Sequence, residues 1–163
     1  MSDLAVNHTG RIVSLNVSPG GVPKRPVAKA RATREGLAGD RQRNRLFHGG
    51  ANRALSLYSA ELIDALRLEG HPIEPGFVGE NVTVAGIDWG LIRPGARLLL
   101  GEVEIEITSF ASPCKTIRHA FLDEEFTRIA EKRYPGWSRV YSRVLREGIL
   151  QVGDRVQPMA SRT

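Results

Sequence analysis

The one thiol of the chain is Cys114, which stands in Ser112-Pro113-Cys114-Lys115 directly after the clearest strand pattern. A single cysteine cannot form an intramolecular disulfide or supply a complete zinc site. It can be an inert core residue, a nucleophile, a sulfur carrier, or the one protein ligand of a metal that brings other ligands with it. Lys115, Arg118 and His119 follow closely. Cationic neighbours favour the thiolate, which is the form that binds metals or attacks sulfur.

A second candidate is the stretch His48-Gly49-Gly50-Ala51-Asn52-Arg53. Adjacent glycines let the backbone approach a ligand closely, and the planar fork of Arg53 suits a phosphate or a carboxylate. A plain turn in which His48 makes a structural hydrogen bond explains the same residues. The spacing alone leaves both interpretations open.

A third candidate is Gly79-Glu80-Asn81, where a carboxylate and an amide follow a glycine at the start of a strand. An amide both donates and accepts, so this pair can recognise the polar edge of a heterocycle. A β-turn in which Asn81 caps local backbone is the competing interpretation.

The sequence lacks the motifs of protein-built metal sites and of nucleotide-binding folds. It contains no Cys-x-x-Cys, no His-Glu-x-x-His, no Gly-x-Gly-x-x-Gly and no P-loop. The four histidines, His8, His48, His71 and His119, are scattered without ligand spacing. A nucleophilic dyad of Cys114 with His48 or His119 stays open.

Charge and composition favour a protein of the cytoplasm that binds a small anionic ligand. The net charge is +5, from 23 Lys and Arg against 18 Asp and Glu. The densest basic stretch, residues 24–45, lacks the interleaved aromatic residues that nucleic-acid binders use for stacking, which disfavours nucleic acid as a partner. No apolar run approaches the length of a membrane span, and the N-terminus lacks the layout of a signal peptide. The single cysteine is typical of a reducing compartment.

Period-two patterns predict a mostly β fold, a barrel or a sandwich with a few peripheral α-helices. We expect residues 1–9 to form a flexible tail and residues 10–160 to form a single domain. Helices are expected after the N-cap Ser59 and over residues 121–134. Exposed strand edges would favour a homodimer. The predicted strands cover residues 11–17, 27–33, 54–58, 80–85, 97–100, 102–108, 139–145 and 155–157.

Taken in order, these stretches resemble the MOSC family, named after the C-terminal domain of molybdenum-cofactor sulfurases, and in particular its stand-alone bacterial members. The resemblance covers most of the chain. It rests on Gly20-Gly21-Val22-Pro23-Lys24, Gly36-Leu37-Ala38-Gly39-Asp40-Arg41, His48-Gly49-Gly50-Ala51-Asn52-Arg53-Ala54, Gly79-Glu80-Asn81-Val82-Thr83, Ser112-Pro113-Cys114-Lys115 and residues 148–154.

The resemblance implies a β-barrel and a site for the molybdenum cofactor, a phosphorylated pterin whose dithiolene holds the metal. One soft protein ligand then suffices, and by similarity that ligand and catalytic residue is Cys114. Pyridoxal phosphate, which belongs to a domain fused to this one in the sulfurases, is not expected in this chain. Family positions suited to phosphate or pterin contact are Lys24, Arg41 and Arg53, and those expected near the metal are His48, Glu80, Asn81 and Ser112.

The function implied by the resemblance is that of a molybdenum-dependent oxidoreductase, which reduces N-hydroxylated compounds such as hydroxylamino-purines or amidoximes. No flavin or iron–sulfur motif is visible, so a separate electron-donor reductase is the expected partner. The alternative is a sulfur carrier, in which Cys114 receives a persulfide from a cysteine desulfurase and passes it to a metal–sulfur centre. A third hypothesis is a non-enzymatic module that stores the cofactor or binds nucleic acid.

Overall fold

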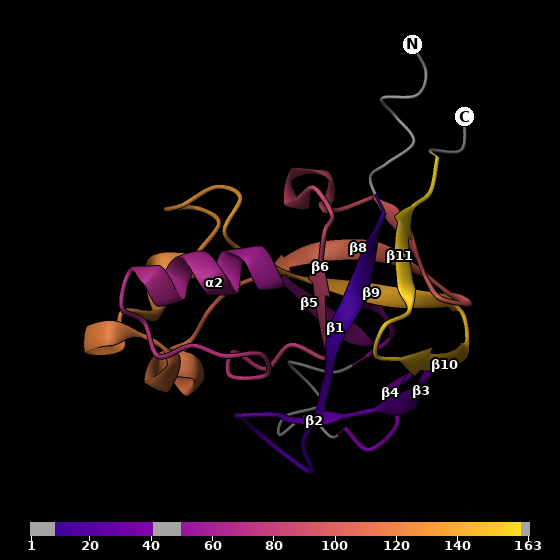
Figure 1. Cartoon of the computed structure of the whole chain (residues 1–163), viewed down its shortest axis with the longest axis horizontal. Helices are drawn as coiled ribbons and strands as arrows, with labels where there is room; N and C mark the ends of the chain where they lie inside the picture. Colours follow the sequence, from indigo (N-terminus) through magenta and orange to yellow (C-terminus); the bar gives the residue numbers. More distant parts are fainter. Residues whose placement is uncertain (1–8, 41–49, 161–163) are drawn as a thin grey trace.

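The computed structural model describes residues 9–40 and 50–160, and within them the fold is a closed β-barrel. Seven strands follow one another around the ring in the order β11-β7-β8-β9-β5-β6-β1, and pairing of β1 with β11 closes it (Figure 1). The mostly β barrel predicted from the sequence is therefore confirmed. The strands of the ring are β1 (Gly10–Val17), β5 (Leu55–Ser59), β6 (Val82–Ala85), β7 (Arg97–Leu100), β8 (Val103–Ala111), β9 (Arg139–Arg146) and β11 (Arg155–Pro158).

Three further strands form a small antiparallel sheet in the order β10-β3-β4. These are β3 (Lys29–Thr33), β4 (Gly36–Leu37) and β10 (Gly148–Gln151). The strand predicted over residues 27–33 is in fact two strands. Its first part belongs to β2 (Arg25–Val27), which extends the barrel sheet beside β1, and its second part is β3.

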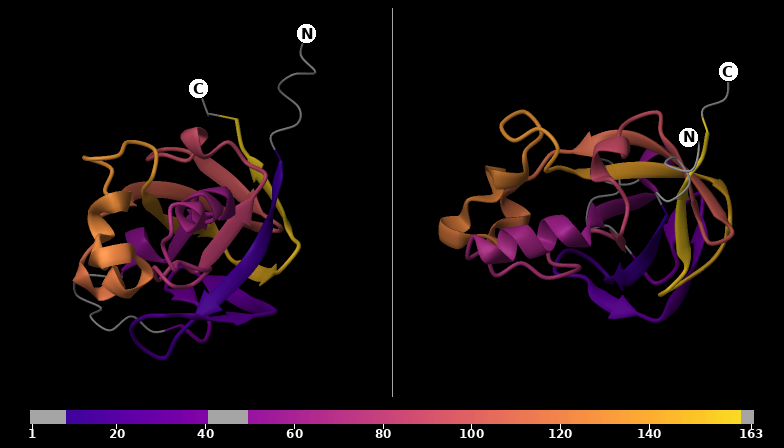
Figure 2. Two further views of the ribbon diagram at one scale, coloured as in Figure 1. Left: turned by 60° about the vertical axis from the view of Figure 1, so that its left-hand side comes forward. Right: turned by 45° about the horizontal axis from the view of Figure 1, so that its top comes forward.

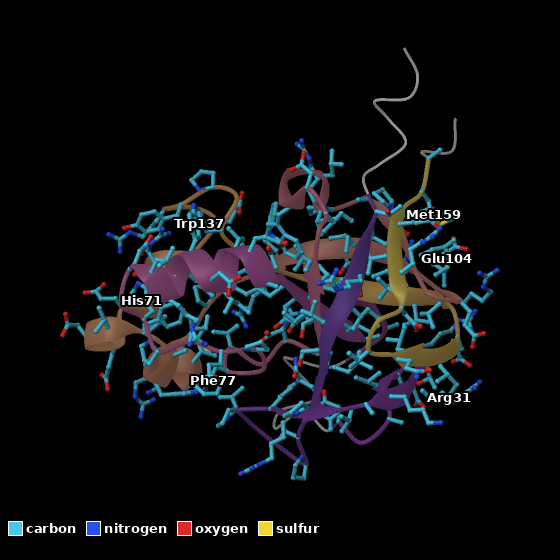
Figure 3. The ribbon with its side chains drawn as sticks, in the orientation of Figure 1. Arg31, His71, Phe77, Glu104, Trp137 and Met159 are labelled. Carbon is cyan, nitrogen blue, oxygen red and sulfur yellow. The ribbon has the colours of Figure 1, made fainter. Side chains whose placement is uncertain are left out.

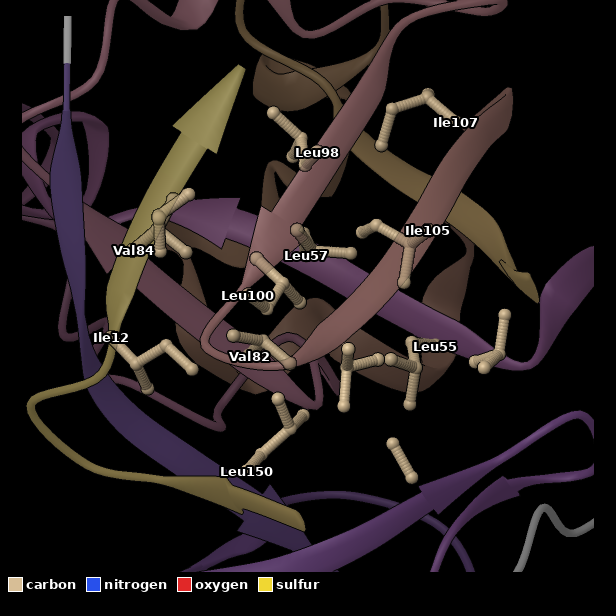
Figure 4. Close-up of a cluster of buried hydrophobic side chains, with 14 of the residues drawn as sticks. Ile12, Leu55, Leu57, Val82, Val84, Leu98, Leu100, Ile105, Ile107 and Leu150 are labelled. Atoms are coloured by element: carbon tan, nitrogen blue, oxygen red, sulfur yellow. The ribbon is translucent and has the colours of Figure 1, made fainter. Parts of the chain in front are cut away.

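The barrel interior is filled by aliphatic side chains from alternate positions of its strands (Figure 4). In β8, Val103, Ile105 and Ile107 are almost completely buried, as their spacing predicts. Leu150 of the small sheet joins the same cluster, so that sheet packs against the barrel core.

The glutamates that alternate with the buried residues of β8 form cross-strand ion pairs on the outer surface. Glu106 lies 2.6 Å from Arg143 of β9, and Glu104 lies 3.4 Å from Arg97 of β7. These pairs make the row part of the charged outer face of the sheet.

A second apolar cluster lies outside the barrel, where α2 (Ala60–Leu68) packs beside the segment that follows Cys114 (Figures 1 and 2). Ser59 caps α2 as predicted, because its hydroxyl accepts from the Leu62 amide at 3.2 Å. No helix of the described residues is long and apolar enough to cross a membrane.

The second α-helix predicted over residues 121–134 is wrong. The chain forms short 3-10 segments there instead, and α2 is the one α-helix in the described residues. Asp123 and Glu124 have φ values of 53° and 58°, which interrupt a right-handed helix. The 3-10 segments of this region are η4 (Lys115–Ala120), η5 (Leu122–Glu124) and η6 (Phe126–Ile129).

Because the barrel core is closely packed, we expect Ile105→Ala to lower the free energy of unfolding by about 2–5 kcal/mol. Ile105 is fully buried, and truncation leaves a cavity that the ring cannot easily collapse. Ile149→Ala is the matched control, since Ile149 is exposed and its truncation removes little packing. Denaturant unfolding of both variants measures the difference, and equal losses would contradict this account of the core.

Candidate functional site

Cys114 lies on the loop that leaves the end of β8. Ala111 ends the strand, Ser112 and Pro113 continue the chain, and Cys114 stands in extended conformation directly before η4. The thiol is exposed, and its sulfur lies 2.9 Å from the hydroxyl oxygen of Thr116. Exposure removes the interpretation of Cys114 as an inert core residue and leaves the chemical ones.

Arg139, the first residue of β9, lies beneath this loop. Its Nη2 donates to the carbonyl oxygens of Ala111 and Ser112 at 3.4 and 3.3 Å. Its Nη1 donates to the carbonyl of Val78 at 2.8 Å. Through these hydrogen bonds, the buried guanidinium connects the Cys114 loop with the loop that precedes β6.

Glu80 is completely buried in the loop before β6. One carboxylate oxygen accepts from the Gly76 amide at 2.9 Å and from the Thr83 hydroxyl at 3.0 Å, and the other has no hydrogen-bond partner among the described residues. Burial raises the pKa of this carboxyl, while the hydrogen bonds from Gly76 and Thr83 and the nearby charge of Arg139 oppose the rise. Glu80 therefore holds the loop before β6 through its hydrogen bonds to Gly76 and Thr83.

Asn81 and Lys24 belong to one buried network. The Lys24 ammonium lies 2.8 Å from a carboxylate oxygen of Asp40, and the Asn81 amide nitrogen donates to the same oxygen at 2.9 Å. The amide oxygen of Asn81 accepts from the backbone of Ser56 at 3.0 Å. Both side chains thus bind distant parts of the chain together. A phosphate contact by Lys24 requires the ion pair with Asp40 to open.

Arg53 ends the short segment η2 (Ala51–Arg53) just before β5. Its guanidinium lies over the ring of Tyr141, 5.0 Å from the centroid. Tyr141 is two residues along β9 from Arg139 and therefore points to the same face of the strand. Arg53 therefore contacts the same face of β9 that carries Arg139.

The remaining candidates divide into two groups. Arg41 and His48 lie outside the described residues, as does a dyad of Cys114 with His48. Ser112 is exposed, and its carbonyl is held by Arg139. His119 is exposed in η4, and its ring lies 6.0 Å from that of Phe77, on the loop before β6 (Figure 3 labels Phe77).

Two residues of the site were missed by the sequence argument, Arg139 and Thr116. Arg139 alternates with Tyr141 and Arg143 in a pattern typical of a solvated strand face. Its burial depends on contacts with loops far away in the sequence. Thr116 stands two residues after Cys114, which is the one local signal that could have identified it.

The donor set suits a metal that arrives with other ligands. Within residues 9–40 and 50–160, no three His, Cys, Asp or Glu side chains group to hold a metal ion. Cys114 offers one exposed soft donor, and Lys115 and Arg118 beside it are exposed cations. Arg118 also lies 3.7 Å from Glu124.

The model of the MOSC domain family matches residues 44–157 of the chain. The uncharacterized protein YflK of Bacillus subtilis (strain 168) is 29% identical over 139 residues, which cover 84% of this chain. The match covers 62% of YflK, so the chain spans less than two thirds of the length of that relative.

Solved structures show the same fold. YiiM from Geobacillus stearothermophilus aligns with a TM-score of 0.71 and 22% identity, covering 93% of this chain and 75% of that one. The YuaD protein from Bacillus subtilis has a TM-score of 0.71 and 19% identity, covering 94% and 97%. YiiM from Escherichia coli has a TM-score of 0.68 and 20% identity, covering 94% and 71%.

The buried carboxyl of Glu80 predicts a specific pH dependence of stability. Because its folded pKa is raised above the ordinary value of 4.5, the folded state holds a proton that the unfolded state releases. The Glu80 contribution is fully present below pH 4.5 and is lost as the pH rises through the folded pKa. We expect Glu80→Gln to remove this loss, so that the free energy of unfolding of the variant gains on that of the wild type as the pH rises.

Denaturant unfolding of both proteins between pH 4 and pH 8 measures this difference. Glu125→Gln, at an exposed glutamate, is the control and should follow the wild-type curve. A difference between Glu80→Gln and wild type that is constant with pH would contradict the proposed ionisation of Glu80.

Proposed function

The chain belongs to the MOSC domain family, and from that premise we propose that it is a molybdenum-dependent oxidoreductase with Cys114 as the protein ligand of the metal. The family is associated with binding of the molybdenum cofactor. The observation that carries the proposal is the position of Cys114, an exposed thiol on a loop whose backbone is held by a buried arginine. An exposed, fixed thiol is what a single metal-ligating cysteine requires.

The residues around Cys114 support an anionic cofactor. When bound, the molybdenum cofactor supplies the dithiolene sulfurs, a phosphate and the redox chemistry. Cys114 then needs to provide only one soft ligand. Lys115 and Arg118 stand beside the thiol, and Arg53 lies over Tyr141, which is on the same face of β9 as Arg139. These cations favour phosphate and oxyanion groups.

The proposed reaction reduces N-hydroxylated compounds. The N–O bond of R–NHOH breaks with two electrons and two protons, the amine R–NH2 forms, and the oxygen leaves as water. The electrons come from a separate reductase carrying a flavin or an iron–sulfur cluster. The part of this chain is to hold the metal at Cys114 and to attract anions near it.

The second candidate is a sulfur carrier, and the exposure of Cys114 favours it equally. A cysteine desulfurase persulfide would be attacked by the Cys114 thiolate, its terminal sulfur would move to Cys114, and the desulfurase thiol would leave. This transfer leaves the overall redox state unchanged and needs no bound metal.

We expect protein from a host that makes the cofactor to contain molybdenum and pterin near stoichiometry, and Cys114→Ser to lose most of the molybdenum. Serine keeps the shape of the side chain but removes the soft donor. Metal analysis and pterin fluorescence measure both contents, and the unfolding midpoint confirms that the variant is folded. Lys29→Ala is the control, since it removes an exposed positive charge from β3 of the small sheet and no proposed ligand.

The outcomes separate the candidates. Pterin without molybdenum in the wild type would favour a cofactor carrier. Absence of both from wild type and variant would contradict the oxidoreductase proposal. A mass increase of about 32 Da on Cys114, which corresponds to one sulfur atom, would then favour the sulfur carrier.

A further expectation concerns the source of electrons. Molybdenum-loaded protein should reduce a hydroxylamino-purine when supplied with a reduced viologen dye, because the dye replaces the donor protein. With NADH alone it should produce no amine above background. Chromatography of the amine product measures both rates. Efficient turnover with NADH alone would show that no separate reductase is required.

A further inference from the structure

Arg139 is a buried cation that is bound by backbone carbonyls. Its Nη1 and Nη2 donate to three carbonyl oxygens, while its buried Nε has no hydrogen-bond partner among the described residues. No ion pair with a carboxylate involves it in the described part of the chain. A buried charge is costly unless its hydrogen bonds are satisfied. Retaining an arginine in this place, where an apolar residue would be easier to bury, calls for a role in holding the loops.

The two loops that Arg139 holds carry different parts of the candidate site. Ser112 stands two residues before Cys114, and Val78 stands two residues before Glu80. One planar guanidinium reaches both carbonyls, so it fixes the distance between two loops that are far apart in the sequence. The rings of Phe77 and His119 meet across the same two regions, 6.0 Å apart between centroids.

Neighbouring groups hold the Arg139 side chain in its orientation. Glu80 lies close enough for electrostatic attraction to Arg139 to act on its carboxyl. Ser138, the residue before Arg139, donates from its hydroxyl to the Arg139 carbonyl at 2.7 Å, and the Ala111 carbonyl lies 3.3 Å from the same hydroxyl. The start of β9 and the end of β8 are thus joined by the register pair of Ala111 with Arg139 and by the Arg139 side chain, directly before the Cys114 loop.

We propose that Arg139 is the positioning residue of the site, which sets Cys114 at a fixed place relative to the Gly76–Asn81 loop. The planar fork acts through the carbonyls of Ser112 and Val78 and does not touch the metal or the substrate. The inference rests on the proposed function only for its consequence, a metal ligand held in one geometry. The hydrogen bonds of Arg139 to both loops do not depend on a bound metal.

The first test measures hydrogen–deuterium exchange in the metal-free full-length protein. In Arg139→Gln, amides of residues 112–117 and 76–79 should exchange about tenfold faster, because charge-assisted hydrogen bonds to both loops are lost. Strands β7 and β11 should keep their protection. Arg139→Lys retains the charge but not the fork, so it should restore protection in one loop and not in both.

Arg143→Gln is the matched control, because Arg143 lies on the same face of β9 but pairs with Glu106 at the surface. It should leave both loops unchanged. The inference is overturned if the loops keep their protection in Arg139→Gln. It is equally overturned if exchange rises uniformly through the barrel, or if Arg143→Gln has the same effect.

A second readout applies to protein loaded with molybdenum. Electron paramagnetic resonance of the metal should change in Arg139→Gln and stay unchanged in Arg143→Gln, because only the former alters the position of the Cys114 sulfur. If wild-type protein holds no molybdenum, the proposed function fails, while the exchange experiment still decides the role of Arg139.

Discussion

Pairing of β1 with β11 closes the barrel, and the rest of the structure depends on this closure. The ring gives each of its strands two neighbours, so the strands become a rigid frame without free edges between them. The homodimer expected from the sequence stays a prediction, since β2 and the small sheet β10-β3-β4 still have edges outside the ring. The frame also fixes the outer faces of β5, β6 and β9, on which the site is built.

Most buried polar groups beside these strands have hydrogen-bond partners, although one oxygen of Glu80 and the Nε of Arg139 have none among the described residues. The arrangement is the same in two places. The Asp40 carboxylate binds both Lys24 and Asn81, and the Arg139 guanidinium donates to the carbonyls of two loops. Long-range side-chain bonds thus attach irregular segments to a rigid sheet, which is how loops carry chemistry without losing their geometry.

The sequence predicts what depends on local pattern. Alternation identified the barrel strands, and Ser59 marked the start of α2. The structure shows that the lone thiol is exposed, while its role stays a prediction. The 121–134 helix failed because Asp123 and Glu124 adopt positive φ, which the spacing of apolar residues does not reveal. Arg139 was missed because it is buried by contacts with loops far away in the sequence. Its local pattern is the same as that of the exposed Arg143. Lys24 was expected to suit a phosphate or pterin contact, and the sequence did not reveal its ion pair with Asp40, sixteen residues away.

Rigidity bears on the choice between the two uses of the thiol. A sulfur carrier has to present its persulfide to a donor and then to an acceptor, so its cysteine benefits from a loop that moves. A metal ligand has to stay in place, because a shift of the sulfur changes the geometry of the metal. The Cys114 loop is joined to β9 by Arg139, which donates to the carbonyl of Ser112. A loop attached in this way limits the movement that a sulfur carrier uses, and it keeps a metal-ligating sulfur in one position. It therefore favours cofactor binding over sulfur transfer.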